Sequence, residues 1–240
     1  MKKVFFILIS SIFITFSAYC KEDLNRYQEE CLSFINQPEI TVSASYGKLL
    51  YKFDKDEDFL KQKTAEKFAK QNQPMDSSLS PIGLTDVRDV LDLDFQAETM
   101  GLSHGYTCVY PKKITINLEY SLPTIYISNT LKPGSCLYDV ALRHEKTHMQ
   151  IYINALDHIL PILKNYTKSL HNSLGIRITS RNESTEDAAK ELNALYFTRI
   201  QQLINSWRKE VEKEQLKLDS PEHYILENKI CEELSAIPEL

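Results

Sequence analysis

The residues whose types and spacing could do chemistry lie in one short stretch, His144-Glu145-Lys146-Thr147-His148. Two histidines four positions apart project from the same face of an α-helix, so both imidazoles can bind one zinc ion. Glu145 follows the first histidine, where it can reach a water molecule bound to that ion. Zinc lowers the pKa of such a water towards neutrality, and a general base can then drive it into a carbonyl group. The stretch therefore predicts a zinc site with His144 and His148 as ligands and Glu145 as the general base.

The sequence around this stretch predicts the helix that carries it. Apolar and histidine positions recur at three- and four-residue steps: Leu137, Ala141, His144, His148, Tyr152, Ala155 and Ile159. This period indicates a long amphipathic helix whose inward face bears both histidines. Ser135 is suited to cap its start. Pro161 is expected to kink or end it near Leu160, and a second helical stretch is expected to run to about Leu174, before Gly175.

The elements before this helix are predicted from shorter patterns. Alternation at period two predicts strands at 40–44, 49–53, 113–118 and 124–128, and residues 119–123 suit a hairpin connection. Short helices are expected at 23–34, 59–71 and 84–91, with an exposed loop at 71–81. A small antiparallel sheet would thus lead into the zinc helix.

The residues after Gly175 are predominantly helical in pattern. Ser184 or Thr185 can cap a long helix that ends at Leu218, and Ser220 followed by Pro221 starts a last helix. The predicted fold class is α+β: a small antiparallel sheet leading into an active-site helix, followed by a helical C-terminal half.

The first twenty residues have the pattern of a signal peptide. A basic start, Met1-Lys2-Lys3, precedes an apolar run from Val4 to Phe16 that is too short to span a bilayer. Cleavage is expected after Cys20 or Ala18, and a lipid anchor at Cys20 is left open. The prediction is a periplasmic or secreted protein without a stable membrane span after cleavage, in which residues 21–240 form a single domain.

Composition excludes one class of partner. The chain is 42% hydrophobic and 25% charged, as expected for a globular protein with a core. Its net charge is −5, and no cluster of lysine and arginine stands out, so no nucleic-acid partner is expected. The sequence does not predict an oligomeric state.

Four cysteines remain after the signal segment: Cys31, Cys108, Cys136 and Cys231. An even number in an oxidising compartment predicts two disulfides, for which three pairings exist. The favoured pairing is Cys108–Cys136 with Cys31–Cys231, which ties the strands to the zinc helix and the two ends of the chain together.

A catalytic zinc site needs a third protein ligand. Asn154 stands ten residues after His144, where metzincins carry their third histidine, so that family is excluded. The remaining candidates are two histidines and three glutamates: His158, His171, Glu183, Glu186 and Glu191.

The sequence around the candidate Glu183, together with the His144–His148 stretch, resembles a known family. His144-Glu145-x-x-His148 followed by Asn182-Glu183-x-x-x-Asp187 resembles the gluzincin pattern of thermolysin-like peptidases. The resemblance implies a zincin-like fold, Glu183 as the third zinc ligand, and Asp187 as a support for a ligand histidine. Glu191 is the next candidate ligand.

A wider likeness rests on four segments of the chain. Residues 108–111, 133–136, 142–145 and 218–224 together look like an uncharacterised group of secreted bacterial His-Glu-x-x-His proteins. That resemblance implies export and a zinc site, and no particular substrate.

The resulting functional prediction is an exported zinc metallopeptidase that hydrolyses bonds in a peptide or protein substrate. Tyr224, His223 and Arg143 are candidates to stabilise the oxyanion. Two alternatives remain: a cell-wall peptide amidase with the same metal site, and a zincin-like envelope protein that binds partners without turnover.

Overall fold

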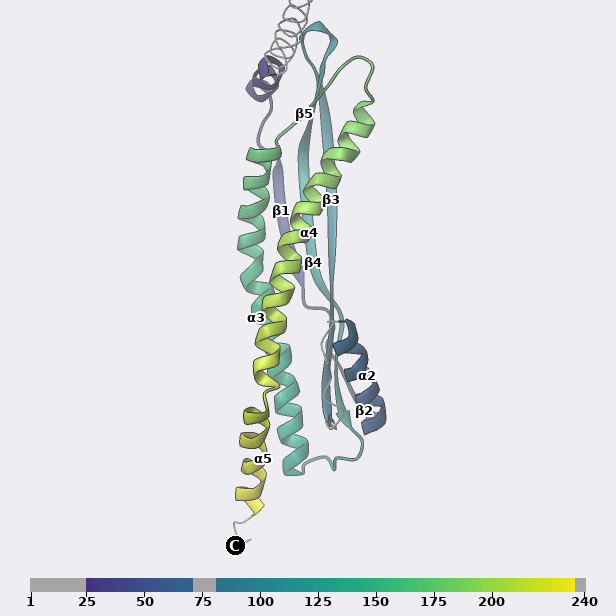
Figure 1. Ribbon diagram of the computed structural model, residues 1–240, viewed down its shortest axis with the longest axis vertical. Coiled ribbons are helices and arrows are strands. Elements are labelled where there is room, and N and C mark those ends of the chain that lie inside the picture. The colour runs from purple at the N-terminus through teal and green to yellow at the C-terminus, as the bar shows by residue number, and fades with distance from the viewer. Residues whose placement is uncertain (1–24, 71–80, 236–240) are drawn as a thin grey trace, which may run out of the picture. The chain divides into compact units, whose positions relative to one another are not determined.

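The computed structural model describes residues 25–70 and 81–235, and these form an α+β protein (Figure 1). The expected signal peptide at 1–20 and nearly all of the expected loop at 71–81 lie outside this part. Residues 25–34 are helical. The elements that follow are β1 (Glu39–Ser45), β2 (Leu50–Lys55), α2 (Glu57–Lys70), β3 (Gly83–Gly101), a 3-10 turn η1 (Ser103–Gly105), β4 (Thr107–Ser128), α3 (Cys136–Leu174), β5 (Arg177–Thr179), α4 (Thr185–Leu218) and α5 (Pro221–Ser235).

The sheet is built around β4, which pairs with each of the other four strands. β5 pairs with it antiparallel, with Cys108 opposite Ile178. β2 pairs with it parallel, with Leu50 opposite Thr124. The expectation of a purely antiparallel sheet is therefore wrong, because the chain between β2 and β4 passes through α2 and β3 instead of a tight turn.

The hairpin expected at 119–123 is absent, because β4 runs through these residues as one strand. Its buried positions change register on the way: Ile116, Leu118 and Tyr120 are buried before this point, and Ile125 and Ile127 after it. A switch from even to odd positions needs one extra residue, as in a β-bulge. Leu122 has φ +48° there, so the strand is locally irregular and the chain does not reverse.

The helix expected at 84–91 is also wrong, because these residues begin β3. From Arg88 to Gln96 the exposure of β3 alternates at period two, with Leu91, Leu93 and Phe95 on the more buried side. The apolar run at 84–91 fits a helix or a strand equally by itself. Pairing with β4 along the sheet decides between them.

The long helices follow the sequence expectations more closely. α4 and α5 start at the expected caps, where Ser184 Oγ accepts the backbone N–H of Asp187 and Ser220 Oγ accepts that of His223. α3 ends at Leu174, before Gly175, whose φ is +46°. The helix end expected near Leu160 is wrong, because α3 continues through Pro161. Proline removes one helical hydrogen bond, and the buried Leu156, Ile159 and Leu163 hold the turns on either side.

The chain divides into two compact units. Unit 1 comprises residues up to Thr41, Leu93–Ile116 and Leu163–Gln202, and unit 2 comprises Val42–Asp92, Asn117–Ile162 and the chain from Leu203 onward. β3, β4, α3 and α4 each contribute residues to both units. Unit 1 has a core that includes Ile114, Tyr196 and Ile200, and unit 2 has a core that includes Leu60, Ile125, Ile127, Leu156 and Ile204.

Two disulfides are present, Cys31–Cys108 in unit 1 and Cys136–Cys231 in unit 2. Their number agrees with the expectation and indicates an oxidising environment. The favoured pairing is wrong. Helix 25–34 lies against the start of β4, where Tyr27 stacks on Tyr106 at 4.2 Å between ring centroids, and this brings Cys31 to Cys108. Cys136 at the start of α3 is left to pair with Cys231 on α5. Among the described residues no helix is long and apolar enough to cross a bilayer.

Candidate metal centre

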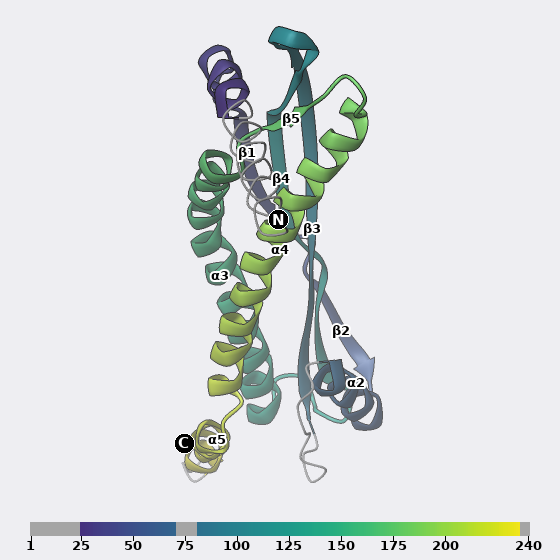
Figure 2. The same cartoon turned by 45° about the horizontal axis from the view of Figure 1, so that its top comes forward.

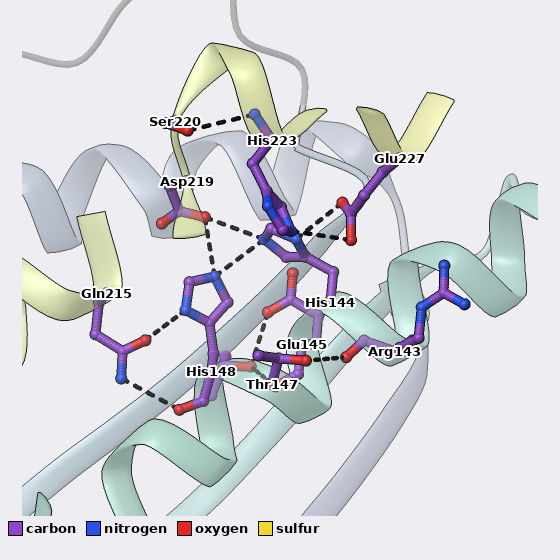
Figure 3. A network of polar contacts seen from close by, with 11 residues as sticks. Arg143, His144, Glu145, Thr147, His148, Gln215, Asp219, Ser220, His223 and Glu227 are labelled. Atoms are coloured by element: carbon purple, nitrogen blue, oxygen red, sulfur yellow. Dashed lines mark hydrogen bonds and ion pairs between the residues drawn. The ribbon is translucent and has the colours of Figure 1, made fainter. Parts of the chain in front are cut away.

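α3 presents His144, Glu145 and His148 on its buried face in unit 2 (Figure 3). The three side chains expose only 4%, 5% and 5% of their surface. The helical period places the two imidazoles one turn apart, as the sequence predicts. Their Nε2 atoms face one another at 3.1 Å.

A carboxylate from another part of the chain completes this arrangement. Asp219 follows the last residue of α4 and precedes α5, so it lies in the connection between these two helices. Its Oδ1 is 3.1 Å from His144 Nε2 and 2.9 Å from His148 Nε2. His144, His148 and Asp219 thus form a group of three side chains that could hold one metal ion.

The amide of Gln215 determines which nitrogen of His148 carries the proton. Gln215 Nε2 donates to the backbone oxygen of His148 at 3.2 Å, so its Oε1 is the atom that faces His148 Nδ1. A carbonyl oxygen only accepts, and Nδ1 must therefore be the protonated nitrogen. In the neutral ring, Nε2 of His148 then carries a lone pair that is directed at Asp219.

His144 has the same tautomer for a similar reason. Its Nδ1 lies 3.0 Å from Oε2 of Glu227, a largely buried carboxylate on α5, and an ionised carboxylate only accepts hydrogen bonds. Nδ1 donates to Glu227, which leaves Nε2 unprotonated in the neutral ring. A carboxylate that holds the outer nitrogen of a histidine in this way is the usual support of a metal-binding imidazole.

Three electron-rich atoms, His144 Nε2, His148 Nε2 and Asp219 Oδ1, therefore face one another, and none of them carries a proton. Two imidazole lone pairs and a carboxylate oxygen repel one another unless a cation, either a metal ion or added protons, lies among them. Zinc bound tetrahedrally at 2.0–2.1 Å separates its ligand atoms by about 3.3 Å. The observed separations of 2.9–3.1 Å are close to this value. Two histidines and one aspartate are also a ligand set that suits zinc.

The charges around the group agree with this assignment. Burial by itself would raise the pKa of Asp219, but the imidazoles of His144 and His148, when they take up a proton at Nε2, outweigh it, and the pKa lies well below its usual range. Burial would lower the pKa of His144, but the carboxylates of Asp219, Glu145 and Glu227 raise it. Both directions show a site that favours positive charge at its centre.

Glu145 is enclosed between α3 and the beginning of β3. Its Oε2 accepts a hydrogen bond from Thr85 Oγ1 at 2.7 Å. Burial raises the pKa of Glu145, which His148, Thr85 and His144 partly oppose. A carboxyl group with a raised pKa is better matched to moving protons near neutral pH.

A second group of potential ligands shares His144. It consists of His144, His223 and Glu227, and His223 Nε2 lies 3.5 Å from Glu227 Oε1. This group contains one fully buried histidine, and His223 is 39% exposed. The hydrogen bond from His144 to Glu227 already accounts for these atoms, so the group with His148 and Asp219 is the better metal position.

The glutamates expected as third ligand do not belong to either group. Glu183 is exposed in unit 1, where its Oε2 accepts the backbone N–H of Ser180 at 2.8 Å. Glu186 forms an ion pair with Lys190, and Glu191 with Arg177. Asp187, expected to support a ligand histidine, is exposed as well. The carboxylate beside the two histidines is Asp219.

The other candidate residues have ordinary surroundings. His158 is exposed, and His171 is buried in unit 1 with Tyr196 Oη 3.4 Å from its Nδ1. Arg143 is exposed, His223 lies beside Glu227, and the side chain of Tyr224 is outside the described part. Asp219 was missed although its segment, 218–224, contributes to the wider likeness. No local spacing connects a residue at a helix end with histidines 71 and 75 positions earlier.

Comparisons with models of protein families, with curated protein sequences and with solved structures find no match for this chain.

Proposed function

We propose that this protein is an exported zinc-dependent hydrolase with a zincin-like site that cleaves peptide bonds. The observation that carries the proposal is the convergence of His144 Nε2, His148 Nε2 and Asp219 Oδ1, with both outer nitrogens held by Glu227 and Gln215. The two disulfides and the sequence pattern at 1–20 support action outside the cytoplasm.

Zinc in this position would supply Lewis acidity, which polarises a carbonyl and makes water more acidic. The chain's own residues provide the rest. His144, His148 and Asp219 bind the ion, and Glu227 and Gln215 orient the imidazoles. Glu145 accepts a proton from the attacking water at its carboxylate. The water oxygen bonds to the carbonyl carbon, the carbon–nitrogen bond breaks, and the proton passes from Glu145 to the departing nitrogen.

The buried Glu145 favours an enzyme over a binding protein. A purely structural metal site closes its ligand sphere and needs no adjacent base. Here a carboxyl group that is not one of the three ligands is buried beside two of them, and keeping it there without a function would be costly.

The test combines metal content with turnover in the full-length protein. We expect about one zinc per chain, and its loss in Asp219→Ala, because one of three ligands is removed. Glu183→Ala is the matched control and should keep its zinc. Glu145→Gln should also keep zinc but lose about 10² to 10⁴ in rate, since general-base assistance is removed.

Two substrate classes distinguish the related activities. A library of peptides tests the peptidase, and cell-wall fragments test the amidase alternative. Zinc retained in Asp219→Ala would contradict the ligand assignment. Zinc bound by the wild type with no cleavage of either substrate class would contradict the enzymatic proposal and favour the binding protein.

A further inference from the structure

A cavity of about 500 Å³ opens beside the metal group in unit 2. Asp219 and Gln215 belong to its lining, and both also contact His148. The other lining residues come from α2, β3, β4, α3 and α4. This volume lies in the range of cavities that bind small ligands.

The lining residues along α4 and just after it run from Asn205 to Asp219. These two residues are fourteen positions apart, which is about 21 Å at a helical rise of 1.5 Å per residue. An extended chain advances about 3.3–3.6 Å per residue, so the lining is long enough for about five residues of a peptide.

Two of the six charged residues of the lining, Arg208 and Asp89, are paired with each other. Arg208 donates from Nε and Nη2 to both carboxylate oxygens of Asp89, at 2.6–3.1 Å, and from Nη1 to Asn205. Asp219 is beside the two histidines. Arg208 and Asp89 therefore neutralise each other and leave no net charge for a ligand at that end.

Unlike Arg208, Lys67 of α2 is not held in an ion pair with a neighbouring carboxylate among the described residues. Its side chain is half-buried in the lining, and it makes no ion pair or hydrogen bond with any residue that the structure describes. It is near enough to the metal group for its charge to lower the pKa of Asp219. A half-buried lysine that makes no close ion pair or hydrogen bond can donate to an incoming carboxylate, and a charge-assisted hydrogen bond of this kind is favourable.

Tyr152 adds an uncommitted hydrogen-bond donor to the same cavity. It follows His148 by four residues on α3, so it lies one turn further along the same face. No described residue accepts a hydrogen bond from its hydroxyl. Burial raises the pKa of Tyr152, and the carboxylates of Asp86, Asp219, Asp89 and Glu212 add to this, so the phenol keeps its proton.

We propose that this cavity is the substrate site and that Lys67 and Tyr152 bind a carboxylate group of the peptide there. That the bound peptide is a substrate rests on the proposed function, whereas binding of its carboxylate by Lys67 and Tyr152 does not require hydrolysis. The carboxylate can come from an acidic side chain or from the peptide's C-terminus, and both present the same group to the two donors.

Trp207 provides a direct readout of binding, because it lines the cavity and is the single tryptophan of the chain. Zinc-loaded Glu145→Gln protein is titrated with peptides of five residues while its fluorescence is followed. One peptide has an acidic side chain and an amidated end, the second a free C-terminus and no acidic side chain, and the third has neither. We expect at least one carboxylate peptide to bind about 10- to 100-fold more tightly than the neutral one.

Variants of the same background assign this preference to residues. Lys67→Met should bring the preference to about twofold or less, since the charge that favours the carboxylate is lost. Lys61→Met, exposed on the same helix, should retain it. Tyr152→Phe should reduce the preference, whereas Tyr120→Phe should not, because the Tyr120 hydroxyl already donates to the backbone oxygen of Tyr152 at 2.8 Å.

The outcomes separate the two proposals. Equal affinity for all three peptides, or a preference unchanged in Lys67→Met, overturns the carboxylate site even if zinc binding and turnover are as proposed. A preference that depends on Lys67 in a protein without turnover supports the site and contradicts the proposed hydrolysis.

Discussion

At the scale of single residues, Gly83 determines how closely β3 approaches Glu145. A methyl group added at Gly83 would lie 2.6 Å from Glu145 Oε1 and 2.8 Å from its Cγ, which is closer than atoms can approach. The backbone of Gly83 does not have a positive φ, so the requirement for glycine is steric. The residue keeps room for the carboxylate that acts as the general base in our proposal.

We therefore predict that Gly83→Ala displaces Glu145 and lowers turnover by about 10- to 100-fold, because a small misplacement of a catalytic group is costly. Zinc content should stay at the wild-type level, since the three atoms nearest to the added methyl group all belong to Glu145 and none to a proposed ligand. Gly101→Ala, at the other end of β3, is the control because a methyl group there meets nothing within 4 Å. Equal activity of the two variants would contradict the positioning role of Gly83.

At the scale of elements, α5 lies beside the first part of α3 (Figures 1 and 2). It supplies Glu227 to the site, and the disulfide Cys136–Cys231 attaches it to α3. Glu227 precedes Cys231 by four residues, so the bond and the carboxylate are one turn apart on α5. The bond therefore holds Glu227 near His144 and fixes the end of the connection that carries Asp219.

We predict that replacing Cys136 and Cys231 by serine weakens zinc binding by about 10- to 100-fold, the range for losing support of a metal ligand. The matched variant replaces Cys31 and Cys108. The two bonds span 95 and 77 residues, so the chain-entropy model gives both a similar stabilisation of about 4.5 kcal/mol.

Competition with a chromophoric chelator measures zinc affinity in both variants. The Cys31–Cys108 variant should keep wild-type affinity, because its bond lies in unit 1 and the metal group in unit 2. A similar loss of affinity in both variants would show that global destabilisation, and not the release of α5, weakens the site.

The sequence predicts those elements whose signals are local. The period of apolar residues and the caps at Ser184 and Ser220 identify α4 and α5, and two histidines one turn apart identify the face of α3 that bears the candidate metal site. What is missed depends on distant contacts. The strand at 84–91 is stabilised by pairing with β4, and the continuity of β4 past Leu122 depends on its neighbours. Asp219 meets the histidines only because α4 and α5 return to α3.

At the scale of the whole molecule, the free energy of unfolding must depend on pH through groups that stay neutral in the folded chain but take up a proton in the unfolded chain. His171 in unit 1 is 5% exposed, and burial lowers its pKa. In the unfolded chain it titrates near its usual value of about 6.5. Below that pH the unfolded state binds more protons than the folded state, so the free energy of unfolding decreases on acidification until the folded state also takes up the proton.

We predict that wild-type protein loses more stability between pH 7.5 and pH 5.5 than His171→Gln, by at most about 1.4 kcal/mol per pH unit, the limit for one proton. Urea unfolding is measured with a chelator present, so that release of metal does not contribute. His144, whose raised pKa acts in the opposite direction, is common to both proteins and cancels in the comparison. His158→Gln replaces an exposed histidine of α3 and should behave like wild type. If His171→Gln loses as much stability on acidification as the wild type, the buried neutral histidine is not the source of the pH dependence.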